Sequence, residues 1–283
     1  MSGDSSIGIG IGLALKSYGR AFRGLLNEYP GAAAAYSLRK LSSSTTNVVR
    51  VRRSSDNAEQ DFTAAEVSDG TLESFCGVGN GFVETWYDQS GNGNDATQSV
   101  TTAQPKIVDG GSLVAGGLEF DNVDDTMVTI NTESFGTSSR SIFAVCSPAS
   151  IGANSDGIVQ LSTNSAQGAG WFLAPELATR TNSITWISST PASTVSNNLI
   201  SNIYTSGNLH AGNAMWLDGT SVTRTSGTDG AINTTTSVIT IGSGLSGSNP
   251  FDGAIAEVII YKSDQSSNRV AIETNINDHY NIY

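Results

Sequence analysis

The segment WYDQSGNGNDATQ, from Trp86 to Gln98, concentrates side chains that can do chemistry. Counted from Asp88, oxygen-bearing side chains stand at positions one, three and five and a glycine at position six, as in a calcium-binding loop. Position twelve is Ser99, whereas an EF-hand needs a bidentate glutamate there. An EF-hand is therefore excluded.

A calcium ion can instead be held between two neighbouring turns. Carboxylate and amide oxygens suit calcium, and the candidate ligands are Asp88, Asn92, Asp95, Asp121 and Asp124, with Asp125 as an alternative. Asx and glycine residues also form turns that need no metal. We favour that interpretation for the loop, and calcium is the one cofactor that stays a candidate.

Tryptophans on candidate strands are the residues best suited to stack on sugar rings. Trp86, Trp171, Trp186 and Trp216 all lie on such strands. For any one of them, packing in the core is the alternative. A cluster exposed on one face would indicate a glycan-binding, lectin-like surface.

Other catalytic and metal-binding patterns are missing from the sequence. It contains two histidines, His210 and His279, and no nucleophile motif beside them. It has no zinc motif, phosphate-binding loop or dinucleotide fingerprint. Cys76 and Cys146 lie in apolar stretches, so we expect two buried free thiols.

These residues must be positioned by strands. Short β-branched and aromatic runs alternate with Gly, Asn and Ser turns, which predicts an all-β sandwich or jelly roll. The expected strands are 48–53, 82–87, 127–130, 141–146, 157–161, 170–173, 183–188, 199–204, 214–217, 221–224, 237–241 and 254–261. Asp218-Gly219 predicts a tight hairpin turn.

Helices are expected at the two ends of the chain. A short helical piece is predicted around 32–41, and a C-terminal helix, capped by Ser263 or Asp264, would place Ile272, Ile276 and Tyr280 on one face. Near the N-terminus an amphipathic stripe is formed by Leu15, Tyr18, Phe22, Leu25 and Tyr29. We predict that residues 1–32 are a docking arm and that 33–283 are one jelly-roll domain; a helix folded back on its own domain is an equal alternative for the stripe.

The net charge and its distribution exclude some classes of binding partner. The net charge of −12 argues against nucleic acid, and no apolar run is long enough to span a membrane. Residues 1–55 carry eight basic and two acidic groups, whereas the remainder is strongly acidic. The N-terminus is a poor secretory signal, so we expect retention in the producing cell.

Several segments, taken in order, resemble a known architecture. YDQSGNGNDATQ, LEFDNVDD, MWLDGT, ITIGSG and FDGAIAEVIIY resemble concanavalin A-like, laminin-G-like jelly rolls over roughly residues 80–283. The upstream segment AAAAYSLRKLSSSTTNVVRVRRSSDNAEQDF resembles bacteriophage virion proteins and, more distantly, the catalytic domain of fungal B-type α-L-arabinofuranosidases.

The glycosidase resemblance implies two carboxylates at positions that this sequence has changed. The nucleophile of that family aligns with Leu173, and the run Ile241 to Leu245 has no acid before Asp252. Hydrolysis would then require Glu176 and Asp252 to have taken over. The sequence therefore predicts that the chain is not an enzyme.

The leading hypothesis is a non-enzymatic virion structural protein on a phage tail, fibre or capsid surface, assembled in the host cytoplasm. Its arm, residues 1–32, would dock on other virion subunits in a homo-oligomer, while the jelly roll binds host glycans. The alternatives are a repurposed glycoside hydrolase that acts on host envelope polysaccharide and a purely structural capsid decoration protein without ligand.

Overall fold

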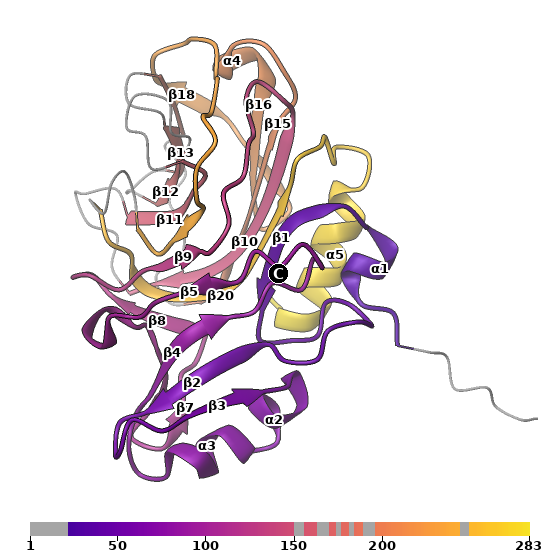
Figure 1. The fold of residues 1–283 in the computed structure, drawn as a ribbon. Coiled ribbons are helices and arrows are strands. Elements are labelled where there is room, and N and C mark those ends of the chain that lie inside the picture. The colour runs from indigo at the N-terminus through magenta and orange to yellow at the C-terminus, as the bar shows by residue number, and fades with distance from the viewer. Residues whose placement is uncertain are drawn as a thin grey trace, which may run out of the picture.

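The computed structural model describes residues 22–149, 156–162, 170–173, 177–180, 184–188, 196–243 and 249–283. Within them, no helix is both long and apolar enough to cross a membrane. The molecule is an all-β jelly-roll sandwich, and its C-terminal helix lies on the outer side of the strands (Figure 1).

The strands form two antiparallel layers that face each other (Figure 1). The first layer contains β1 (Ala32–Ser37), β8 (Leu118–Asp121), β10 (Arg140–Pro148), β15 (Asn198–Tyr204), β16 (Asn213–Leu217), β17 (Thr220–Val222) and β20 (Asp252–Tyr261). The second contains, in order of pairing, β5 (Ala96–Thr97), β9 (Met127–Thr129), β19 (Thr240–Ile241), β11 (Asp156–Gln160), β12 (Gly170–Leu173), β13 (Leu177–Arg180), β14 (Thr185–Ser188) and β18 (Arg224–Ser226).

A third group of strands joins both layers. It comprises β2 (Val49–Arg53), β3 (Glu59–Phe62), β4 (Gly81–Trp86), β6 (Lys106–Asp109) and β7 (Ser112–Leu113). β4 pairs with β5 of the second layer, and β6 pairs with β8 of the first. These pairings place the turn that follows β8, residues 121–125, next to β4 and β6.

Alternation along β10 creates two cores. Ile142 and Ala144 face the interior between the layers, whereas Phe143 and Val145 face the helices. Every residue of β10 except Ser147 is buried, as expected for a strand covered on both faces. Most of the predicted strands are confirmed, with ends shifted by a few residues.

The helices are short except at the C-terminus. They are α1 (Leu25–Glu28), α2 (Ala64–Ser68), α3 (Thr71–Cys76), α4 (Leu209–Gly212) and α5 (Arg269–Tyr280), with a 3-10 turn over Thr101–Ala103. The predicted C-terminal helix is confirmed as α5, although its N-cap is Asn268. Ile272 and Ile276 pack against the first layer.

Two helix predictions need correction. Residues 32–37 form strand β1, because pairing with β20 in a fully buried position overrides the helical preference of alanine. In the described part of the N-terminal stripe, the helix is limited to α1. Leu25 is 1% exposed and Tyr29 packs beside it on the domain, so Leu25 cannot dock on a partner; for these two residues the alternative of a helix folded back on its own domain is the one observed. Phe22 is exposed; Leu15 and Tyr18 lie outside the described residues.

Two smaller predictions are confirmed. Asp218 and Gly219 both have positive φ, at 50° and 72°, as the predicted tight turn between β16 and β17 requires. Cys76 and Cys146 are buried free thiols.

Candidate functional site

The loop after β4 is held by hydrogen bonds to the carboxylate of Asp88. Asp88 Oδ1 accepts from the backbone amides of Ala35 and Ser90, both at 2.9 Å. Asp88 Oδ2 accepts from the Ser90 hydroxyl at 2.7 Å and from the Asn94 amide at 3.0 Å. Protein donors thus occupy both oxygens that a calcium ion would need.

The neighbouring amide side chains bind strand β1 and the segment after it. Gln89 is 4% exposed, and its Nε2 donates to the carbonyls of Ser37 and Arg39. The Nδ2 of Asn92 donates to the carbonyl of Ala33. These bonds fasten the loop to the first layer, which is a structural task.

Asp95 completes the loop. One of its carboxylate oxygens accepts from the Asp88 backbone amide at 2.9 Å, and burial raises its pKa above the usual aspartate value. The structure thus brings together Asp88, Asn92 and Asp95, which the sequence predicted as calcium ligands. Their side chains form hydrogen bonds to the protein instead.

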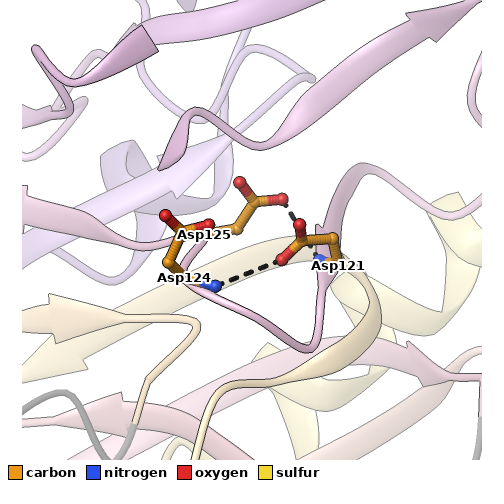
Figure 2. Close-up of side chains that lie close together, drawn as sticks. All are labelled: Asp121, Asp124 and Asp125. Carbon is orange, nitrogen blue, oxygen red and sulfur yellow. Dashed lines mark hydrogen bonds between the residues drawn. The ribbon is translucent and has the colours of Figure 1, made fainter. Parts of the chain in front are cut away.

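A second group of acids lies in the turn after β8, which we call the acidic turn, residues 121–125. Figure 2 shows Asp121, Asp124 and Asp125 clustered there, with one oxygen of each lying within 4.8 Å of the others. Among the described residues, this is the one group of three such side chains close enough to share an ion. Asp88 and Asp95 do not belong to it, so the structure does not form the calcium site predicted between the two turns.

Local bonds fix the acidic turn. Asp121 Oδ1 accepts from the amides of Val123 and Asp124, at 2.9 and 3.3 Å. Asp125 Oδ2 accepts from the Asp121 amide at 3.1 Å (Figure 2). By chemistry the three carboxylates suit a hard cation, and calcium at this turn stays a prediction.

Asp125 differs from its neighbours because it is 6% exposed. Burial raises its pKa to about 7, and the negative charge of Asp121 contributes to the same shift. A carboxyl group with this pKa is substantially protonated near neutral pH. It can therefore donate a proton, as a general acid must.

A pocket of about 260 Å³ opens beside this pair. Its wall is formed by residues of β4, β6, β8, the acidic turn and the segment between β5 and β6, namely Phe82, Thr102, Gln104, Lys106, Glu119, Asp121 and Asp125. Lys106 lies 3.2 Å from Glu119. We call this the carboxylate pocket.

Strand register adds a fourth acidic residue. Asp252, the first residue of β20, stands directly opposite Asp121 of β8. Side chains of directly opposed residues lie on one face of a sheet. The sequence suggested Asp252 as a replacement catalytic residue, and the structure places its strand position beside the acidic turn.

The positions implied by the glycosidase resemblance lie on two strands that flank β11. Leu173 on β12 stands opposite Asp156, and Ile241 on β19 stands opposite Val159. Glu176 and residues 244–248 lie outside the described residues.

The predicted glycan-stacking tryptophans need correction. Trp86 and Trp186 are 0% and 3% exposed, because alternation turns them into the core between the layers, so neither can stack on a sugar. Trp216 is half-buried, and the guanidinium of Arg269 lies 4.3 Å from its ring centre. The side chain of Trp171 lies outside the described residues.

Sequence reasoning missed the carboxylate pocket. It treated Asp121 and Asp124 as metal ligands and Asp125 only as an alternative to them. The available signal was the spacing D-x-x-D-D after a strand, which brings three carboxylates into one turn. The neighbours that bury Asp125 come from distant parts of the chain, and no local pattern reveals them.

Comparisons with known proteins identify the architecture. The family model of the catalytic domain of α-L-arabinofuranosidase B matches residues 27–158. Among solved structures, a GH54 α-L-arabinofuranosidase soaked with a cyclic sulfate inhibitor is similar over 88% of this chain, with 16% identity and a TM-score of 0.67. An arabinofuranosidase complexed with arabinofuranosyl-α-1,2-xylobiose has the same identity and coverage and a TM-score of 0.61.

This chain spans 63% of the length of each of those two proteins. No curated protein sequence matches it. The distant resemblance to the arabinofuranosidase catalytic domain is therefore confirmed, as a likeness of fold.

The expectation that the chain is not an enzyme is wrong. It depended on the loss of two aligned carboxylates, whereas the family model that matches residues 27–158 describes a catalytic domain.

Proposed function

We propose that this protein is a glycoside hydrolase that acts on arabinofuranosyl-containing polysaccharide. The observation that carries the proposal is the pair Asp121 and Asp125 at the carboxylate pocket, on a fold similar to that of arabinofuranosidases. One carboxyl of this pair is protonated near neutral pH, and its exposed neighbour supplies the negative charge.

The spacing favours a reaction that retains the anomeric configuration. Carboxylate oxygens of Asp121 and Asp125 lie within 4.8 Å of each other, which is less than the roughly 6.5–9.5 Å that inverting glycosidases need to admit a water. Asp125 donates its proton to the leaving oxygen while Asp121 attacks the anomeric carbon and forms a glycosyl ester. Water then breaks that ester and returns a proton to Asp125.

The resemblance suggests a second pair, Glu176 and Asp252. Asp252 stands opposite Asp121, so it can serve at the same end of the first layer. We assign the reaction to Asp121 and Asp125, because these two side chains line one pocket. The assay below distinguishes the two pairs.

The setting of this activity is also part of the proposal. The sequence resemblance to virion proteins favours display on a phage particle as a homo-oligomer, in which the part of residues 1–32 that precedes α1 contacts other virion subunits. The substrate would then be a host envelope polysaccharide, and glycan binding would be substrate binding.

Two substrates with different leaving groups test the roles of the two aspartates. Cleavage of arabinan expels a sugar alkoxide, which must be protonated as it leaves. Cleavage of 4-nitrophenyl α-L-arabinofuranoside expels nitrophenolate, which leaves without protonation. Asp125→Asn should lower kcat/KM on arabinan about 100-fold or more and spare kcat/KM on the aryl glycoside, which reports only the step that forms the ester. Asp121→Asn should abolish both reactions, and Glu28→Gln, at an exposed and remote carboxylate, should change neither.

The outcomes separate the claims. Absence of hydrolysis of arabinan, the aryl glycoside and host envelope polysaccharide by the wild-type chain would overturn the hydrolase proposal. Full activity of Asp121→Asn and Asp125→Asn, with loss in Asp252→Asn or Glu176→Gln, would keep the hydrolase and reject our residue assignment.

A further inference from the structure

A larger cavity, of about 600 Å³, lies away from the carboxylate pocket. It is bounded by the segment after β1, by α2, by residues 113–117 and by the C-terminal end of α5. It shares no lining residue with the carboxylate pocket. We call it the Lys40 cavity.

Apolar atoms form most of its wall. Leu38, Ala64, Val67, Val114 and Ala256 all line the cavity. Its volume falls in the range of about 300–1,000 Å³ that is usual for small-molecule sites, whose walls are mostly apolar with a few placed polar groups.

One of its two cationic side chains is already neutralised. Arg39 donates from Nε and Nη2 to both oxygens of the fully buried Glu257, at 2.7 and 2.9 Å, and from Nη1 to Asn275 at 2.9 Å. The guanidinium therefore belongs to the floor of the cavity and offers a ligand little charge.

Lys40 is different. Its ammonium lies 5.7 Å from the ring centre of Phe22, and no carboxylate of the described residues lies within 4 Å of it. No Asp or Glu lines the cavity, although the chain carries a net charge of −12. The cavity thus joins an aliphatic wall to a cation without a described acidic partner.

We propose that the Lys40 cavity binds an amphipathic organic anion, whose apolar body lies against the aliphatic wall and whose carboxylate pairs with Lys40. The apolar body supplies most of the binding free energy by leaving water. The ammonium selects for negative charge and fixes the orientation of the ligand. This site does not depend on the proposed hydrolase activity.

Calorimetric titration of the full chain with decanoate tests the proposal. We expect saturable binding of one decanoate per chain, with weaker binding of the uncharged decanol and none of acetate, which lacks the apolar body. Lys40→Met removes the ammonium, keeps most of the apolar side chain and should weaken decanoate binding about tenfold, the effect of one ion pair of about 1.4 kcal/mol. Lys262→Met removes a charge remote from the cavity and should leave the affinity unchanged.

A second variant fills the space instead of removing the charge. Ala65 is exposed on α2 at the edge of the cavity, so Ala65→Trp should fold normally and abolish binding. Equal affinity for decanoate and decanol, or unchanged binding by either Lys40→Met or Ala65→Trp, would overturn the proposal. So would the absence of decanoate binding to the wild-type chain.

Discussion

Asp125 combines burial, a neighbouring negative charge and a position in the wall of a pocket. Its folded-state pKa of about 7 lies above its usual value of 3.8. The folded chain therefore holds this proton more tightly than the unfolded chain does. The stability that this gives is fully present below about pH 4 and is lost as pH rises through about 7.

The loss of stability with rising pH gives a test of the raised pKa of Asp125 that needs no substrate. Asp125→Asn cannot ionise, so its free energy of unfolding relative to wild type should rise by about 2–4 kcal/mol between pH 4 and pH 8. Urea denaturation at the two pH values measures the change, with Glu28→Gln as control. A constant difference between Asp125→Asn and wild type would contradict the raised pKa.

Asp88 gives the second prediction for a single residue. Its carboxylate accepts four hydrogen bonds from protein donors, so Asp88→Ala should lower the free energy of unfolding by about 2–4 kcal/mol. We also expect calcium to change the melting temperatures of wild type and Asp88→Ala by the same amount, because protein donors occupy the Asp88 oxygens. Melting curves with calcium and with a chelator measure both effects; stabilisation by calcium that disappears in Asp88→Ala would restore the metal site.

At the scale of elements, the pairing of β8 with β20 positions the acidic turn. Gly117 precedes β8 with φ of 118°, and a Cβ atom there would lie 2.3 Å from the Ile255 carbonyl oxygen on β20. Gly116 also has positive φ, but its nearest contacts would be 3.3 Å away. The two glycines therefore share a strained backbone conformation and differ in the space available.

This difference gives a matched pair of variants. Gly117→Ala should lower the free energy of unfolding by about 3 kcal/mol or more, since backbone strain and a clash with β20 add. Gly116→Ala should cost about 1–2 kcal/mol from strain alone. Urea denaturation compares them, and equal losses would show that close approach of β8 to β20 does not matter.

Local patterns predicted most strands but misplaced one important element. Alternation and turn residues were sufficient for β10, β15 and β20, and the Asp218-Gly219 turn was read correctly. The local preference of alanine predicts a helix over 32–37, whereas these residues form β1. The cause is the pairing of β1 with β20, which joins residues more than 200 positions apart. No local preference encodes such a contact.

At the scale of the whole molecule, the sequence predicted the sandwich but only part of the site. It identified Asp121, Asp124 and Asp252 as notable acids, whereas burial of Asp125 depends on the way in which distant strands surround it. The prediction that Trp86 and Trp186 stack on sugar rings is wrong for a related reason. Alternation shows that one side of a strand is buried, but the arrangement of the layers decides which side.

The pH dependence of arabinan hydrolysis by the wild-type chain tests the central claim most directly. A general acid must hold its proton, so the rate should fall about tenfold per pH unit above about pH 7. Over the same range the rate on 4-nitrophenyl α-L-arabinofuranoside should stay nearly constant, because its leaving group needs no proton. The same fall for both substrates, or for neither, would contradict the role of Asp125, and absence of hydrolysis at every pH would contradict the hydrolase itself.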